Sequence, residues 1–236
     1  MPMDRTLTAS GLSFSGNGLK LLAAAAMTVD HVGLVLFPSV QILRLIGRLA
    51  FPIFAFMIAE GCAHTRNHLR YLLSVLILAV VCQSAYTLAM RSWFLCVPVS
   101  FAIAIALVLL LENWKRTANH LWGVAFLAGV AAVWVFTSKV TLDYGFWGCM
   151  MPVAASLFRG SEKLDSNPIH VLAMGVLMVP LALQLGAWQW WSFLALPLLL
   201  LYSGKRGKGK MKYFFYIFYP THLLVIQGIA LLLYMT

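Results

Sequence analysis

Residues 19–37 read LKLLAAAAMTVDHVGLVLF, an apolar run that contains the adjacent ionisable residues Asp30 and His31. A transmembrane helix needs about 20 mostly apolar residues, so this run is long enough to cross a bilayer. It follows a polar stretch, residues 1–18, that holds several Ser and Gly. The two together imitate a signal peptide, but no clear cleavage site follows the apolar run. We therefore interpret 19–37 as a retained first helix, with 1–18 as a polar tail and 19–236 as a single transmembrane helical domain.

The composition of the whole chain also indicates a membrane protein. Of the 236 residues, 62% are hydrophobic and 10% are charged, whereas a soluble domain carries about 25% charged residues. So few charges cannot cover the surface of a soluble globule of this size, and a water-soluble enzyme is excluded. The net charge of +10 does not indicate a nucleic-acid partner, because the cations lie in short clusters between apolar runs. The four cysteines lack CxxC spacing, which indicates packing residues rather than disulfides or a metal site; they are Cys62, Cys82, Cys96 and Cys149.

The same length criterion finds further apolar runs along the chain. It predicts an all-α, polytopic integral membrane protein with about nine transmembrane helices, and a count of eight to ten fits the pattern. The runs are 19–37, 42–63, 69–90, 94–112, 119–137, 144–158, 168–185, 189–203 and 213–235. The sixth and eighth runs are short, and we interpret them as tilted partners or half-spans.

Positively charged residues mark the cytoplasmic ends of transmembrane helices. Under the nine-helix interpretation, 13 of the 17 Lys and Arg residues fall at alternate ends of the helices. They are Arg5, Lys20, Arg66, Arg70, Lys115, Arg116, Arg159, Lys163, Lys205, Arg206, Lys208, Lys210 and Lys212, and the other four are Arg44, Arg48, Arg91 and Lys139. We therefore predict that the amino terminus and the tail 1–18 are cytoplasmic and that the carboxyl terminus is outside.

An ionisable group inside a membrane span is a functional candidate, because burying it in the bilayer is unfavourable. Asp30 and His31 lie about ten residues into the first run, which at 1.5 Å per residue places them near the bilayer midplane. A histidine titrates near neutral pH and is suited to act as a general base. The alternative is a buried structural pair with another helix. Adjacent residues diverge by about 100° around a helix, so a carboxylate that orients His31 is expected from another helix rather than from Asp30.

Two arginines, Arg44 and Arg48, are four residues apart and therefore share one face at the start of the second run. At membrane depth they need anionic partners, and Asp30 is the nearest candidate in the sequence. We expect them to anchor an acceptor substrate or the carboxylate of the site. The alternative is that they extend to the outer headgroups. Pro52, later in the same run, is expected to kink the span.

Other acidic residues lie near the ends of predicted helices. Glu60 falls near the cytoplasmic end of the second run, where Arg66 or Lys20 would neutralise it. Asp143 and Tyr144 open the sixth run on the outer side and are candidates for substrate binding. The alternative for Asp143 is an ordinary helix N-cap.

The last run carries Tyr216, Tyr219 and His222 at three-residue steps, so these side chains lie along one face. A second histidine at membrane depth favours a polar cavity, whereas ordinary aromatic packing is the alternative. The stretch 204–210, GKRGKGK, places glycines between cations and so permits close approach of its backbone to a phosphate. The positive-inside pattern accounts for these cations equally well.

Several motifs along the chain match one known family. They are Asp30-His31, GRLAFPIFAF at 47–56, Glu60-Gly61, DYGFWG at 143–148, YSGKRG at 202–207 and FYPTHL at 218–223. On these residues the sequence resembles the TraX family, named for a protein linked to acetylation of conjugative pilin. The similarity spans nearly all of 19–235, and it is lowest from about 95 to 140. The family in turn looks like a branch of the transmembrane acyltransferases, in which a first-helix histidine is the proposed catalytic residue.

The resemblance implies an acyltransferase that uses acetyl-CoA from the cytoplasm and contains no metal. His31 and Asp30 would be the catalytic residues. Lys20 stands eleven residues before His31, at the position where the related type-three membrane acyltransferases have arginine. We expect the phosphates of this donor to be held by the cytoplasmic cations Lys20, Arg66, Lys205 and Arg206. The residues expected to bind the acceptor are Arg44, Arg48, Asp143, Tyr144, Tyr219 and His222. The acceptor would be a protein amino terminus or an envelope glycan, and the protein would lie among the lipids of the bacterial inner membrane.

Two other functional classes stay open at this point. A proton-coupled transporter or exporter would use Asp30, His31 and His222 as a relay. A structural or assembly subunit would use none of them for chemistry. For the acyltransferase, the sequence leaves open whether the acceptor is an amine or a hydroxyl, and whether transfer is direct or passes through an acetyl-histidine.

Overall fold

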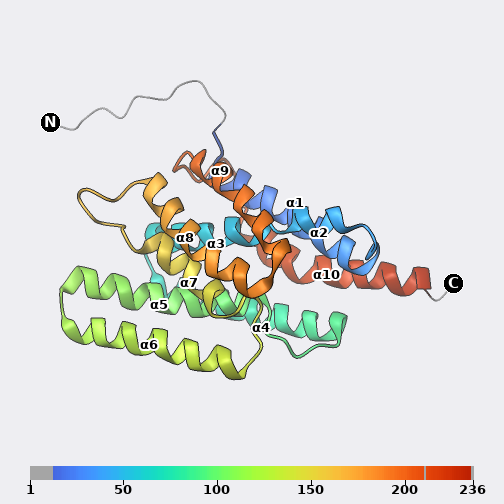
Figure 1. Ribbon diagram of the computed structural model, residues 1–236, viewed down its shortest axis with the longest axis horizontal. Helices are drawn as coiled ribbons and strands as arrows, with labels where there is room; N and C mark the ends of the chain where they lie inside the picture. The colour runs from blue at the N-terminus through green and yellow to red at the C-terminus, as the bar shows by residue number, and fades with distance from the viewer. Residues whose placement is uncertain (1–12, 210, 235–236) are drawn as a thin grey trace.

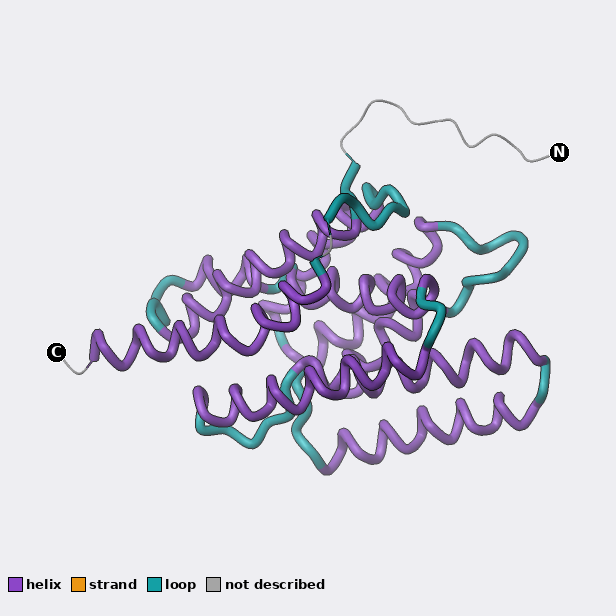
Figure 2. Tube along the Cα trace, turned by 180° about the vertical axis from the view of Figure 1, so that it is seen from behind, coloured by secondary structure: helices purple, strands orange, loops and turns teal. Residues whose placement is uncertain are grey.

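The computed structural model describes residues 13–209 and 211–234, and the regular structure in these ranges is helical (Figures 1 and 2). The α-helices are α1 (Gly16–Val35), α2 (Gln41–Gly47), α3 (Ala50–His64), α4 (His68–Met90), α5 (Val97–Thr117), α6 (His120–Lys139), α7 (Gly145–Ser156), α8 (Asn167–Leu185), α9 (Ala195–Leu200) and α10 (Lys212–Tyr234). A 3-10 helix, η1 (Ala187–Leu194), leads into α9. The predicted all-α class is confirmed. Residues 1–12 of the predicted tail lie outside the described ranges, and α1 begins at Gly16, inside the stretch predicted to be tail.

Seven helical stretches in the described part of the chain are long and apolar enough to span a membrane, and the protein is a polytopic membrane protein. They are α1, α2 with α3, α4, α5, α6, α8, and Phe214–Leu233 of α10. The expected count of about nine is therefore wrong. The two missing spans are the two short runs. Of these, α7 has 12 residues and η1 with α9 has 8 and 6, whereas about 20 are needed to cross the bilayer core.

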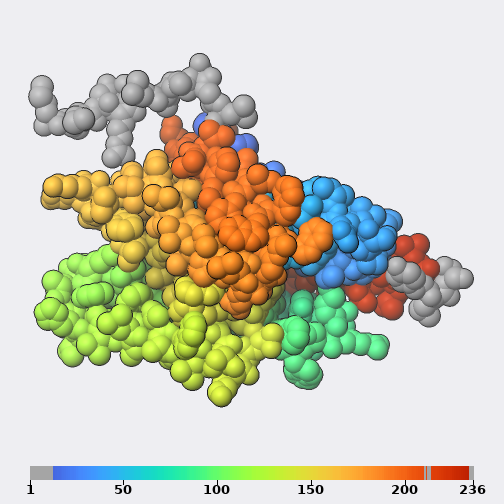
Figure 3. Space-filling view, in the orientation of Figure 1, coloured from blue at the N-terminus to red at the C-terminus, as the bar shows by residue number. Residues whose placement is uncertain are grey.

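The short helix α7 is apolar because it lies inside the protein rather than against lipid. Every residue from Gly148 to Ser156 is buried, and α7 packs against α3, α5 and α8. By contrast, in α6 Gly123 is the buried residue and most of the others face outward along one edge of the bundle (Figure 1). Apolar composition alone cannot separate these two situations, and this is why the sequence predicted too many spans. On the face shown in Figure 3, η1 lies beside α2.

The second apolar run is divided into α2 and α3 at Arg48 and Leu49. Pro52 follows in the first turn of α3 and lacks the backbone N–H that would bond to the carbonyl of Arg48 in a continuous helix. The α-helix is interrupted one turn before this proline, at Arg48 and Leu49, and the kink itself stays a prediction.

Contacts between loops define two ends of the bundle. At one end, which we call the basic end, Lys115 donates to the carbonyl of Ser156 at 2.8 Å, and Arg159 forms a buried ion pair with Glu60. The start of α1 and residues 201–209 lie at this end too. The opposite end holds the loops 36–40, 91–96 and 140–144, with Leu95 and Leu142 joined in a short bridge.

The glycine-rich segment at the basic end completes the first turn of α1. The first N–H groups of a helix have no partner within it. Here the carbonyls of Lys205 and Arg206 accept hydrogen bonds from the N–H groups of Gly16 and Asn17, each at 2.8 Å. A Cβ on Gly207, whose φ is +88°, would lie 2.5 Å from the hydroxyl of Ser15. The close backbone approach expected at 204–210 is therefore made to α1, and Lys210 lies outside the described residues.

Helices α1 and α2 approach each other closely at Gly47. A Cβ on this glycine would lie 2.1 Å from Oδ1 of Asp30, so Gly47→Ala must push the Asp30 side chain or the two helices apart. We expect this substitution to lower the free energy of unfolding by about 1–3 kcal/mol, the usual effect of overpacking. Thermal unfolding in detergent micelles measures the change.

Gly228 in α10 is the matched control, because a Cβ there meets no atom within 4 Å. Since alanine favours helix over glycine, Gly228→Ala should leave stability unchanged or raise it. Equal destabilisation by both substitutions would show that the approach at Gly47 is not a tight contact.

Candidate active site

The two histidines at membrane depth meet in the structure. Helices α1 and α10 run side by side (Figure 1), and Nε2 of His222 lies 3.0 Å from Nδ1 of His31, within hydrogen-bond distance. The two ring planes are tilted by 49°. His222 is buried and His31 is half-buried. Two residues that the sequence proposed separately, 191 positions apart, therefore form one pair.

The pair lies further from the basic end than expected for His31. His31 is fifteen residues after Gly16 in a helix of 20 residues, which places it about 22 Å along a helix of about 30 Å. We predicted a position near the midplane because the helix was expected to begin at residue 19. The observed start at Gly16 places His31 closer to the opposite end. The separation between Lys20 and His31 stays within α1, at about 16 Å.

Aromatic side chains of α10 hold the ring of His222. Phe218 stacks on it with ring centroids 5.0 Å apart and planes 9° apart, and Tyr219 meets it edge-on at 5.8 Å. Nδ1 of His222 lies 3.0 Å from the carbonyl oxygen of Phe218. This carbonyl can only accept, so Nδ1 of His222 donates to it.

Asp30 turns away from His31 and binds Arg44. The ion pair joins Nη1 of Arg44 to Oδ2 of Asp30 at 2.5 Å, across α1 and α2. Arg44 thus has the anionic partner that the sequence suggested. We expected a carboxylate from another helix to orient His31. The described hydrogen bonds of the His31 side chain include no carboxylate, and its partner is His222. Nε of Arg48 is buried and makes no hydrogen bond with any residue that the structure describes.

At the opposite end, Asp143 and Tyr144 close the turn before α7. Tyr144 is the N-cap residue of α7, with a left-handed φ of 62°, and its ring stacks on Phe51 at 3.7 Å. The N-cap alternative for Asp143 is therefore wrong. Desolvation raises the pKa of Asp143 to about 6, against the attraction of Arg48. Ser100 donates to the backbone carbonyl of Asp143 at 3.0 Å, which joins this turn to α5.

A cavity of about 570 Å³ leads from the basic end into the bundle, and we call it the inner cavity. Lys20, Asn17 and Arg206 line it near the start of α1, and Phe218 and Tyr219 line it deeper along α10. Its other walls come from α3, α4 and α5. The cavity therefore reaches the turn of α10 that precedes His222, although neither histidine lines it.

The structure separates the four cations that we expected to hold the donor. Lys20 and Arg206 line the inner cavity, whereas Arg66 and Lys205 do not. Arg66 is exposed, and Lys205 uses its backbone carbonyl to complete the first turn of α1. Only the folded chain shows which clustered cations face the cavity.

Sequence reasoning missed part of the cavity wall. Glu60 lines it and is paired with Arg159 rather than with Arg66. Tyr202 lines it as well, and desolvation together with the charge of Glu60 raises the pKa of its hydroxyl. Glu60 is an acidic residue within an apolar run, so the sequence indicated that it is buried. Arg159 was counted among the cations that mark the cytoplasmic side, and its pairing with Glu60 was therefore not predicted.

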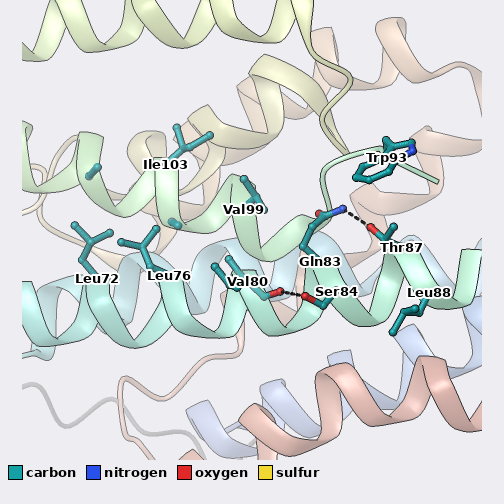
Figure 4. Close-up of a pocket in the computed structure, with 13 residues that line it drawn as sticks. Leu72, Leu76, Val80, Gln83, Ser84, Thr87, Leu88, Trp93, Val99 and Ile103 are labelled. Carbon is teal, nitrogen blue, oxygen red and sulfur yellow. Dashed lines mark hydrogen bonds between the residues drawn. The ribbon is translucent and has the colours of Figure 1, made fainter. Parts of the chain in front are cut away.

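A second, larger hollow is not a candidate active site. It is a groove of about 840 Å³ between α4 and α5, lined mostly by aliphatic side chains (Figure 4). Its polar side chains are engaged locally: Gln83 bonds to Thr87 and to the carbonyl of Phe94, and Ser84 bonds to the carbonyl of Val80. None of the residues proposed from the sequence lines this groove.

Comparison with known proteins identifies relatives along nearly the whole chain. The family described as "TraX protein" matches residues 15–230. The probable fimbrial assembly protein FimC, serogroup H1, of Dichelobacter nodosus is 26% identical over 91% of this chain and 95% of its own length. Protein TraX of Escherichia coli is 28% identical over 90% of this chain and 86% of its own length. No solved structure is significantly similar to this chain.

Proposed function

Because this chain belongs to the TraX family of multi-pass membrane proteins, we propose that it is a membrane-embedded acyltransferase. It moves an acetyl group from acetyl-CoA to an amine or hydroxyl of an envelope or pilin-like acceptor. The family is implicated in pilin acetylation, and one relative is named as a fimbrial assembly protein. Both point to an acceptor protein of the cell surface.

The observation that carries the proposal is the arrangement of the inner cavity and the histidine pair. The cavity has cations near the basic end, and its deep end is formed by Phe218 and Tyr219. Phe218 stacks on His222, which in turn lies against His31. A long, flexible donor with phosphates at one end and a thioester at the other fits this order of groups.

The residues present suit the donor. Lys20 and Arg206 are placed to bind phosphate oxygens, Arg206 by paired N–H groups and Lys20 as a point charge. The mostly apolar wall between them and Phe218 suits the less polar arm of the donor. The donor supplies the acetyl group as an activated thioester.

His31 provides the base. As the acceptor nitrogen or oxygen attacks the thioester carbonyl, His31 takes the proton of the attacking N–H or O–H group. It then returns this proton to the sulfur as the carbon–sulfur bond breaks, so that free thiol and acetylated acceptor are released. Asp30, bound to Arg44, supports the site by holding α1 against α2. Arg48, Asp143 and Tyr144 lie toward the opposite end, from which the acceptor would approach.

The transporter alternative finds less support. A relay through Asp30, His31 and His222 needs Asp30 to exchange protons with the pair, but Asp30 is bound to Arg44. The charged residues Asp30, Arg44, Arg48 and Asp143 do not line the inner cavity, so its described wall offers no chain of charged groups for such a relay.

His31→Gln tests the base. Glutamine keeps a polar side chain of similar volume but cannot transfer a proton, so the variant should fold and bind CoA while acetyl transfer falls about 100-fold or more. Purified protein with labelled acetyl-CoA and an amine acceptor measures the rate, and Gly228→Ala serves as the active control. A near-normal rate in His31→Gln would show that His31 is not the base.

Arg206→Gln tests the donor site. Loss of a charge-assisted contact should raise KM for acetyl-CoA about tenfold with a smaller change in kcat. Lys205→Gln removes the same charge one residue away, where the side chain does not line the inner cavity, and should change KM less than twofold. Equal changes of KM in the two variants would show that the donor is attracted by the overall positive charge of the segment and is not bound by the Arg206 side chain.

We also propose that the basic end is cytoplasmic and that the protein lies in the bacterial inner membrane, with its amino terminus inside and its carboxyl terminus outside. The positive-inside rule supports this orientation. All four native cysteines are buried, so single cysteines placed at the exposed positions Lys208 and Thr141 report on the two ends.

In intact cells, an impermeant thiol reagent should label Thr141→Cys, and it should label Lys208→Cys only after the membrane is permeabilised. The reverse pattern would invert the orientation.

A further inference from the structure

We propose that His222 is a positioning residue that fixes the tautomer of His31, so that Nε2 of His31 is the atom that takes the proton. The inference rests on the acyltransferase function proposed above and assigns a distinct role to each histidine of the pair. It follows from hydrogen-bond geometry on α1 and α10.

The direction of the hydrogen bonds follows from one carbonyl. Nδ1 of His222 lies 3.0 Å from the carbonyl oxygen of Phe218, and a carbonyl has no hydrogen to donate, so Nδ1 of His222 carries the proton. In a neutral imidazole the other nitrogen then has only a lone pair. Nε2 of His222 must accept, and Nδ1 of His31, 3.0 Å away, must donate.

The same logic fixes the reactive atom of His31. With its proton on Nδ1, a neutral His31 has its lone pair on Nε2. This leaves Nε2 as the basic nitrogen of the ring. The backbone carbonyl of Met27, one turn earlier in α1, also accepts from the His31 ring. Loss of His222 should therefore move part of the proton population to Nε2, and that fraction of the molecules would have no base at Nε2.

The bond to His222 also favours the charged form of His31. When Nε2 takes a proton, the ring becomes an imidazolium, and hydrogen bonds donated by a cation are stronger than those donated by a neutral group. The acceptor is rigid, because His222 is buried, stacked on Phe218 and bound to the Phe218 carbonyl. His222 therefore has the orienting role that the carboxylate has in a Ser-His-Asp triad, without the negative charge of that carboxylate, while Asp30 is bound to Arg44.

The direct test is ¹⁵N NMR of the full-length protein in lipid nanodiscs with labelled histidine. One-bond and two-bond N–H correlations distinguish the two tautomers, and comparison with His31→Gln assigns the signal of His31. We expect the proton of His31 on Nδ1 in the wild type. In His222→Leu, which cannot accept a hydrogen bond, the proton should redistribute toward Nε2. A wild-type His31 with its proton on Nε2 would overturn the proposal.

The kinetic test separates positioning from packing. His222→Leu should lower kcat for acetyl transfer about 10- to 100-fold, the usual range for losing a group that orients another, with KM for acetyl-CoA within twofold. His222→Gln retains a carbonyl oxygen that can accept from Nδ1 of His31, and it should recover a large part of kcat. Equal kcat losses in His222→Leu and His222→Gln, with equal thermal stability, would leave only a packing role for His222.

The two readouts distinguish this inference from the proposed function. If the wild type transfers no acetyl group while His31 shows its proton on Nδ1, the acyltransferase function is wrong and the hydrogen-bond assignment stands. If acetyl transfer depends on His31 but not on His222, the function stands and the positioning role is wrong. If His222→Leu does not fold, the wild-type spectrum and the His222→Gln variant still decide between the outcomes.

Discussion

A charged side chain at membrane depth must find its partner within the protein, because lipid offers none, and the ion pair between Asp30 and Arg44 meets this requirement for the first two spans. The pair draws α2 against α1 so closely that the facing position, Gly47, has no room for a Cβ. It also engages the carboxylate next to His31. The histidine must then take its hydrogen-bond partner from elsewhere, and α10 provides His222.

Helix α10 thus joins the two halves of the proposed site. One turn, Phe218 and Tyr219, closes the deep end of the inner cavity, and the next turn carries the histidine that contacts α1. The carbonyl and ring of Phe218 also hold His222 in place. The same turn of α10 therefore lines the proposed donor site and holds His222, which is bonded to the proposed base His31. The segment before α10 performs a similar double task, since residues 205 and 206 complete the first turn of α1 while the Arg206 side chain lines the cavity.

The interior of the bundle includes a helix, α7, that is shorter than a typical membrane span. Helix α7 packs against α3, α5 and α8, and every residue from Gly148 to Ser156 is buried. Its carboxyl end is held by Lys115, and the loop that follows supplies Arg159 to Glu60. A buried ion pair of this kind is costly to break once formed, and it keeps the wall of the inner cavity in place at the basic end.

Features that depend on local composition could be predicted from the sequence: the all-α membrane class, the division of the chain into apolar runs, the break near Pro52 and the residues that are costly to bury in a bilayer. The sequence identified His31, His222, Asp30 and Arg44 individually, because each is ionisable within an apolar run. The contacts between distant segments required the folded chain: the two histidines pair with each other, and Asp30 pairs with Arg44. The folded chain also shows that Lys20 and Arg206, rather than Arg66 and Lys205, line the cavity. It alone separated the spans from the buried helix α7 and from η1 with α9. Lipid and the protein interior both favour apolar residues, so a membrane span and a buried helix have the same composition. The sequence around a cation likewise does not show whether its side chain contacts water, a carboxylate or a substrate.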